Sequence, residues 1–150
     1  MQSPETEGGT NSADDNDDES YGADRKPLIL LAEDDLDVQA ALTEFLELSG
    51  YDVVAVSNGS DMLDALANAA ANEEREADLI ITDVRMPGFN GLSIAEELRA
   101  DGWKQPIIII SAFGDDIIRE RIRRMDQCEF FAKPLDPLRL EKMLAELCAR

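Results

Sequence analysis

The sequence contains no histidine. This absence excludes a histidine general base, histidine metal ligands and a phosphohistidine formed on the chain itself. The two cysteines, Cys128 and Cys148, lack the spacing of a metal site, so we interpret them as reduced thiols of minor structural role. No segment reaches the roughly 20 apolar residues that a membrane helix needs, and no apolar run behind a basic start marks a secretory signal. We therefore expect a cytoplasmic protein without membrane contact.

Basic residues are also scarce. The chain has 14 lysines and arginines against 33 aspartates and glutamates, a formal net charge of −19, which argues against binding to nucleic acid. Residues 1–26 contain eight acidic residues and almost no large apolar side chain, so we expect a disordered acidic tail there. Residues 27–150 still hold 25 acidic and 12 basic residues, and we expect them to form one acidic domain.

Short apolar runs of strand length alternate with amphipathic, helix-like patterns after residue 26. The runs lie at 28–32, 51–56, 79–82, 107–110 and 130–132, and the helical patterns lie at about 36–48, 62–69, 92–100, 117–125 and 138–147. Runs that are apolar on both faces are typical of a parallel sheet covered by helices on both sides. With right-handed crossovers, this alternation predicts an α/β fold with a doubly wound parallel sheet of five strands and five helices.

Ionic and polar side chains stand where four of these runs end, and in a doubly wound sheet ligands bind at the carboxyl ends of the strands. Those side chains are Glu33, Asp34 and Asp35 after the first run, Asp83 after the third, Ser111 after the fourth and Lys133 after the fifth. Closely packed carboxylates repel one another unless a cation lies among them, and an all-oxygen site of this kind suits Mg²⁺. A lysine and a hydroxyl can bind phosphoryl oxygens. Together these groups predict a phosphoryl-transfer site whose nucleophile is a carboxylate.

Four segments carry a resemblance to a known family. They are LLAEDD at 30–35, IITDVRMPG at 80–88, IIISA at 108–112 and FFAKP at 130–134. In this order and at these strand ends, they resemble the response-regulator receiver domain of two-component signalling, over about residues 27–148. The resemblance implies a flavodoxin-like or CheY-like (βα)5 fold with the strand order 2-1-3-4-5.

The resemblance also implies roles for the residues of the site. Asp83 would accept a phosphoryl group from a sensor histidine kinase or a histidine phosphotransferase. Glu33, Asp34 and Asp83 would hold Mg²⁺ together with the backbone carbonyl of Arg85. Lys133 would then contact the phosphoryl oxygens.

A switch is implied by the same resemblance. Ser111 would turn toward the phosphoryl group while Phe130 changes its burial, although Phe130 lacks the hydroxyl that a tyrosine would carry there. Arg85 and Phe113 match two positions that tune the lifetime of the phosphoryl group. The bond between Lys133 and Pro134 is expected to be cis.

Such a receiver is not an enzyme, except in its own phosphorylation and dephosphorylation. We expect output by contact with a downstream protein target, through the surface around the fourth and fifth helices, from a monomer or a phosphorylation-dependent homodimer. The chain would be a stand-alone receiver or a phosphorelay intermediate. Alternatively, it is the receiver of a longer regulator whose output domain is absent.

Other functions fit the residues less well. A haloacid-dehalogenase-like phosphohydrolase needs a second aspartate two positions after the nucleophile, where this chain has Arg85. A flavodoxin-like cofactor-binding module needs a loop rich in Gly, Ser or Thr after the first strand, and the acidic residues 33–35 would repel its phosphate. A receiver-like domain that mediates contacts without phosphorylation stays open as an alternative.

Two further features have a structural and a functional interpretation. Asp35 fits the N-cap of the following helix better than a metal site. The arginines of the fourth helix form either a solvated face or a surface for a partner; they are Arg119, Arg121, Arg123 and Arg124. The spacing of four residues favours side-chain pairs between Glu120 and Arg124 and between Asp115 and Arg119.

Overall fold

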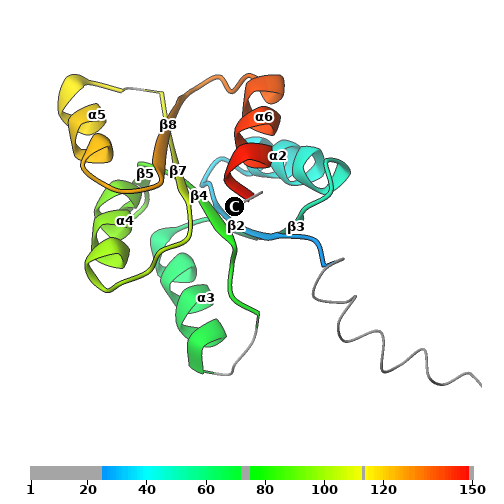
Figure 1. Cartoon of the computed structure of the whole chain (residues 1–150), viewed down its shortest axis with the longest axis horizontal. Helices are drawn as coiled ribbons and strands as arrows, with labels where there is room; N and C mark the ends of the chain where they lie inside the picture. Colours follow the sequence, from blue (N-terminus) through cyan, green and yellow to red (C-terminus); the bar gives the residue numbers. More distant parts are fainter. Residues whose placement is uncertain (1–24, 72–74, 113, 149–150) are drawn as a thin grey trace, which may run out of the picture.

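The computed structural model describes residues 25–71, 75–112 and 114–148 (Figure 1). Its main sheet has five parallel strands in the order β3-β2-β4-β7-β8. These strands are β2 (Leu28–Ala32), β3 (Asp52–Val56), β4 (Leu79–Asp83), β7 (Ile107–Ser111) and β8 (Cys128–Ala132). Numbered along the chain, they follow the order 2-1-3-4-5, which confirms the predicted fold. The segment expected to be an acidic tail, residues 1–26, lies almost wholly outside the described residues.

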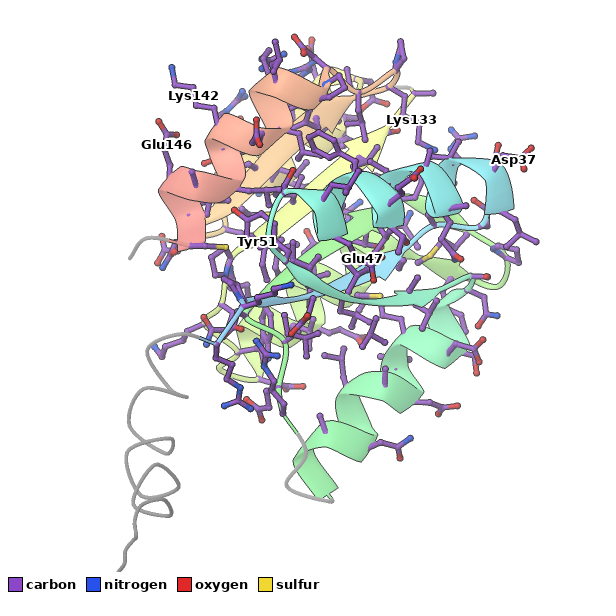
Figure 2. All side chains as sticks on the ribbon, turned by 90° about the vertical axis from the view of Figure 1, so that its right-hand side faces the viewer. Asp37, Glu47, Tyr51, Lys133, Lys142 and Glu146 are labelled. Atoms are coloured by element: carbon purple, nitrogen blue, oxygen red, sulfur yellow. The ribbon has the colours of Figure 1, made fainter. Side chains whose placement is uncertain are left out.

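Among the described residues, five helices connect or follow these strands and cover both faces of the sheet (Figure 1). They are α2 (Leu36–Leu48), α3 (Gly59–Ala71), α4 (Gly91–Ala100), α5 (Asp116–Arg123) and α6 (Pro137–Cys148). The core side chains of α2 and α6 pack in one apolar cluster, and those of α3, α4 and α5 pack in the other. The exposed side chains of Lys142 and Glu146 extend outward from α6, and that of Asp37 extends from the start of α2 (Figure 2).

The burial of each strand follows its place in the sheet. Every residue of the central strands β4 and β7 is buried, as the apolar runs predict. The prediction of burial on both faces is wrong for β3, where Val54 and Ala55 are exposed. This strand lies at the edge of the sheet and has a neighbouring strand on one side alone. None of the described helices combines the length and the apolarity that a membrane crossing requires.

Several helix boundaries have a clear local cause. Asp35 caps α2, because its carboxylate accepts hydrogen bonds from the backbone N–H groups of Asp37 and Val38, as predicted. Asn90 caps α4 in the same way. The loop between β4 and α4 contains a feature that the sequence did not indicate. Two-residue strands, β5 (Arg85–Met86) and β6 (Phe89–Asn90), form a small antiparallel hairpin beside the end of β4.

Candidate phosphoacceptor site

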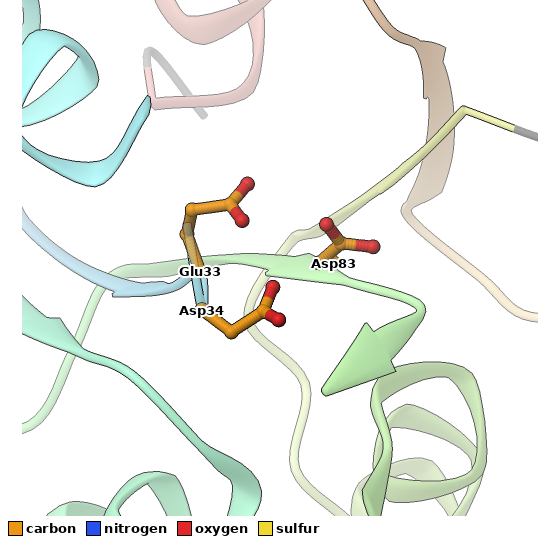
Figure 3. Close-up of side chains that lie close together, drawn as sticks. All are labelled: Glu33, Asp34 and Asp83. Atoms are coloured by element: carbon orange, nitrogen blue, oxygen red, sulfur yellow. The ribbon is translucent and has the colours of Figure 1, made fainter. Parts of the chain in front are cut away.

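Three carboxylates meet at the carboxyl edge of the sheet (Figure 3). Glu33 and Asp34 follow β2, and Asp83 is the last residue of the neighbouring strand β4. Parallel neighbours end at the same edge, and one carboxylate oxygen from each residue lies within 4.8 Å of the others. Glu33 is 1% exposed and Asp83 is 7% exposed, whereas Asp34 is exposed. The site is therefore a buried acidic pair with a solvent-facing third carboxylate.

Lys133 brings a cation to this cluster from the end of β8. Its Nζ lies 2.6 Å from Oδ2 of Asp83 and 2.9 Å from Oε1 of Glu33. The backbone N–H of Lys133 donates to the carbonyl of Ser111 at 3.0 Å, which fixes the loop after β8 to the end of β7. The bond between Lys133 and Pro134 is cis. The side chain of Lys133 is 24% exposed, so it lies between the buried carboxylates and the solvent.

The charges of the cluster do not balance. Burial, assisted by the negative charge of Asp83, raises the pKa of Glu33, although the N–H of Asp35 and the ammonium of Lys133 oppose this. Burial alone would lower the pKa of Lys133, but its hydrogen bond to Asp83 and its close contact with the carboxylate of Glu33 outweigh burial and raise it. The lysine is therefore charged, and its single ammonium lies between two buried carboxylates, with the third carboxylate of the cluster, Asp34, making no ion pair with it among the described residues.

One oxygen of the cluster also lacks a well-aligned hydrogen bond. Oε1 of Glu33 is buried and accepts none, although it lies 2.9 Å from the ammonium of Lys133. That contact is an ion pair without hydrogen-bond alignment. An under-coordinated, negatively charged oxygen beside two further carboxylates matches the oxygen ligands that Mg²⁺ takes in proteins. The residues present therefore fit a hard divalent cation.

The backbone around Asp83 is held closely. Its Oδ1 accepts a hydrogen bond from the backbone N–H of Arg85 at 3.1 Å. Gly91 opens α4 and donates its N–H to the carbonyl of Val84 at 2.7 Å. A Cβ atom at Gly91 would collide with the carbonyl oxygen of Asp83 and the hydroxyl of Thr82. Sequence reasoning missed this requirement for glycine, and the dipeptide Asn90-Gly91 after the Pro-Gly turn was the available signal.

The predicted switch residues lie on the two neighbouring strands β7 and β8. Ser111 ends β7, is 2% exposed and follows Ile110, the partner of Asp83 in the sheet register. Phe130 is half-buried on β8, and its ring packs so closely on Gly114 that a Cβ there would collide with it. Arg85 is exposed, and Phe113 lies outside the described residues.

Most arginines of α5 have partners within the fold. Arg121 makes two hydrogen bonds to Glu96 of α4, at 2.9 and 2.5 Å. The predicted pair of Glu120 and Arg124 is confirmed at 3.5 Å, and Glu120 also binds Arg123 at 2.6 Å. Solvated and interhelical pairing therefore accounts for much of the apparent basic patch.

The predicted side-chain pair of Asp115 and Arg119 is wrong. Asp115 instead caps α5 by accepting the N–H of Ile118 at 2.8 Å. The guanidinium of Arg119 lies over the ring of Phe130, 4.4 Å from its centroid, and its Nε donates to the carbonyl of Gly114 at 3.3 Å. Arg119 thus connects α5 to the strand and loop that carry the predicted switch.

The chain is similar to known signalling proteins over most of its length. Residues 29–145 match the response regulator receiver domain. The chain is 34% identical over 130 residues to the sensory/regulatory protein RpfC of Xanthomonas campestris pv. campestris, with 82% of this chain and 17% of that protein covered. It is 32% identical over 121 residues to the response regulator MprA of a Mycobacterium species, with 81% and 49% covered.

A solved structure shares the fold. The response regulator receiver domain (CheY-like) of Methylobacillus flagellatus superposes with a TM-score of 0.68 at 26% identity, covering 81% of this chain and 98% of that one. A doubly wound sheet that gathers acidic residues and a lysine at its carboxyl edge defines a receiver. The chain belongs to the response-regulator receiver domain family, a family of signalling domains rather than enzymes. It spans about half or less of the length of the curated relatives named above.

Proposed function

We propose that the chain is a phosphorylation-dependent signalling switch in which Asp83 accepts a phosphoryl group from a histidine of a sensor kinase or phosphotransferase. The observation that carries this proposal is the ammonium of Lys133, 2.6 Å from Oδ2 of Asp83, within a cluster of three carboxylates at the sheet edge. In the transfer, an oxygen of Asp83 forms a bond to phosphorus while the bond from phosphorus to the histidine nitrogen breaks. The histidine keeps that electron pair.

Glu33, Asp34 and Asp83, with the backbone carbonyl of Arg85, would hold Mg²⁺. When bound, the ion supplies positive charge that offsets the carboxylates and the phosphoryl oxygens. Lys133 then exchanges part of its contact with Asp83 for a phosphoryl oxygen, and the hydroxyl of Ser111 donates to another. Arg85, together with Phe113, is proposed to tune how long the phosphoryl group persists.

The proposed output is a change in the surface around α5 and α6. Ser111 and Phe130 lie on neighbouring strands, so a movement of Ser111 toward the phosphoryl group changes the space beside the ring. Arg119 covers that ring and bonds the loop before α5, which gives the ring a direct connection to the helix. A population shift at the site would therefore reach the arginine-bearing helix.

The partner proposals follow from the surroundings of the site. An apolar groove of about 560 Å³ is lined by residues of α2, by the start of α6 and by Lys133. It offers a surface for the protein that carries the phosphohistidine. Downstream, we propose a protein target, contacted by a monomer or a phosphorylation-dependent homodimer. Residues 27–150 would form the receiver domain behind an acidic tail of residues 1–26, either alone, as a phosphorelay intermediate or within a longer regulator.

Incubation with acetyl phosphate and Mg²⁺, followed by intact mass spectrometry, tests the proposal. We expect the mass of one phosphoryl group to be added with Mg²⁺, and little addition with EDTA. Asp83→Asn should abolish the addition. Asp37→Asn, which alters an exposed carboxylate on α2, is the matched control and should be phosphorylated like the wild type. An equal addition to the Asp83→Asn variant would contradict the proposal.

A further inference from the structure

Gln39, in the first turn of α2, connects the ends of two neighbouring strands. Its Nε2 donates to the carbonyl of Glu33 at 3.0 Å and to the carbonyl of Val56 at 2.9 Å, and it lies 3.2 Å from the hydroxyl of Ser57. Carbonyl oxygens only accept hydrogen bonds, so the nitrogen of the amide must face them. One side chain of α2 therefore holds the ends of β2 and β3 together, beside the acidic cluster.

The backbone between Glu33 and Asp35 is held on both sides of Asp34. The N–H of Glu33 donates to the carbonyl of Val56 at 3.0 Å, and the N–H of Asp35 donates to Oε2 of Glu33 at 3.0 Å. The carbonyl of Glu33 and the N–H of Asp34 belong to one planar peptide group. Because Gln39 holds that carbonyl oxygen, it also sets the orientation of the plane from which Asp34 projects.

Asp34 depends on this arrangement more than the other two carboxylates of the cluster do. Glu33 and Asp83 are buried and contact Lys133 directly. Asp34 is exposed, and across residues 25–71, 75–112 and 114–148 its carboxylate has no hydrogen bond or ion pair. It nevertheless lies within 4.8 Å of the other two carboxylates. Among the described residues, no side-chain contact holds it there, so its place in the cluster depends on the backbone from which it projects.

We propose that Gln39 is a positioning residue for the metal and phosphoryl site: by fixing the peptide between Glu33 and Asp34, it directs the Asp34 carboxylate toward Glu33 and Asp83. Gln39 contacts neither the metal nor the phosphoryl group. The inference rests on the proposed function, because it gives the orientation of Asp34 a purpose only if the cluster binds Mg²⁺. It adds a residue of α2 to the site through which phosphorylation would proceed.

The test compares the binding of Mg²⁺ to the wild type and to Gln39→Met, which keeps the length of the side chain but removes its donors. Isothermal titration calorimetry gives the affinity, and the rise in thermal midpoint with Mg²⁺ gives an independent measure. Loss of a group that orients a metal ligand typically weakens affinity by about tenfold or more. We expect about tenfold for Gln39→Met. Gln105→Met, at an exposed position before β7, is the matched control and should bind like the wild type.

The rate of phosphorylation separates positioning from general damage to the fold. Gln39→Met should need more Mg²⁺ for its half-maximal rate with acetyl phosphate, while its rate at saturating Mg²⁺ stays close to that of the wild type. A variant that is merely destabilised would have a lower thermal midpoint without Mg²⁺ but an unchanged requirement for Mg²⁺. That result would overturn the proposal.

A second variant covers the case in which Gln39→Met does not fold. Gln39→Asn keeps the donors but shortens their reach. We expect it to weaken the affinity for Mg²⁺ in the same way as Gln39→Met. An affinity for Mg²⁺ within twofold of the wild type, in whichever variant is folded, would refute the role of Gln39. If the wild type itself neither binds Mg²⁺ nor accepts a phosphoryl group, the proposed function fails instead, and the two failures are distinguishable.

Discussion

Glu33→Gln offers the sharpest test of the electrostatics of the site. The substitution keeps the size of the side chain and removes its charge. With an effective dielectric constant of about 20, the contact of 2.9 Å with Lys133 is worth about 6 kcal/mol of attraction. Repulsion from Asp83 and Asp34, at 4.8 Å or less, is about 3.5 kcal/mol or more for each pair before solvent screens the exposed Asp34. Attraction and repulsion thus nearly cancel.

The cost of burying the carboxylate therefore decides whether Glu33→Gln stabilises or destabilises the fold. Glu33 is 1% exposed, and moving an ion out of water costs several kcal/mol, which its hydrogen bond from Asp35 offsets only in part. A glutamine oxygen can accept that same hydrogen bond. We expect Glu33→Gln to raise the free energy of unfolding by about 1–2 kcal/mol at pH 7.5 without a divalent metal.

The effect should depend on pH in a definite direction. Folding raises the pKa of Glu33 above its ordinary value of 4.5, so the folded state binds its proton more tightly than the unfolded state does. The stability that this proton provides is present below pH 4.5 and is lost as the pH rises through the folded-state pKa. The advantage of Glu33→Gln should therefore be larger at pH 7.5 than at pH 4.

Urea denaturation followed by circular dichroism measures these differences, with EDTA or with Mg²⁺. The wild type should gain more stability from Mg²⁺ than Glu33→Gln does, because the variant has lost a metal ligand. Glu44→Gln removes an exposed charge on α2 and should change stability little. If Glu33→Gln is less stable than the wild type at pH 7.5 in EDTA, the ion pair with Lys133 dominates and the reasoning is refuted.

Three other substitutions test separate parts of the account. Lys133→Met should lower the free energy of unfolding by about 2 kcal/mol in EDTA, because it leaves buried carboxylates without their cation. Mg²⁺ should restore part of the lost stability. Equal urea midpoints for the variant and the wild type would contradict this prediction. Gly91→Ala should lower the free energy of unfolding by about 1–3 kcal/mol, and with it the thermal midpoint, because the added Cβ meets the carbonyl of Asp83. A thermal midpoint like that of the wild type would show that α4 can shift without cost. Arg119→Ala should lower the free energy of unfolding by about 0.5–1 kcal/mol and change the NMR signals of the Phe130 ring. Arg119→Lys should retain part of the contact. Unchanged ring signals in both variants would argue against the contact in solution.

Much of the fold was predictable because apolar runs and strand ends have simple geometric consequences. The boundaries of β2 and α2 agree with the pattern of apolar residues and with the cap at Asp35. Parallel strands end at one edge of a sheet, so Glu33, Asp83 and Lys133 were expected to meet although 50 residues separate each from the next. The chemistry of the site followed from that convergence.

The remaining features depend on contacts that the local sequence does not record. Val54 has the same apolar character as the residues of the central strands, and only its place in an edge strand exposes it. Arg119 stands four residues after an aspartate, yet its partner is an aromatic ring on another element. Gln39 looks like any polar residue on a helix surface, and its hydrogen bonds appear only when β3 lies beside β2. Spacing rules describe one element at a time and cannot find such partners.

Chemical trapping determines whether Asp83 itself becomes phosphorylated. After reaction with acetyl phosphate and Mg²⁺, borohydride reduces an aspartyl phosphate to homoserine, and peptide mass spectrometry locates the changed residue. We predict homoserine at position 83, at no other acidic position, and only when Mg²⁺ is present. A reduced residue elsewhere in the chain, or a phosphoryl group that resists borohydride because it sits on a hydroxyl, would contradict the account.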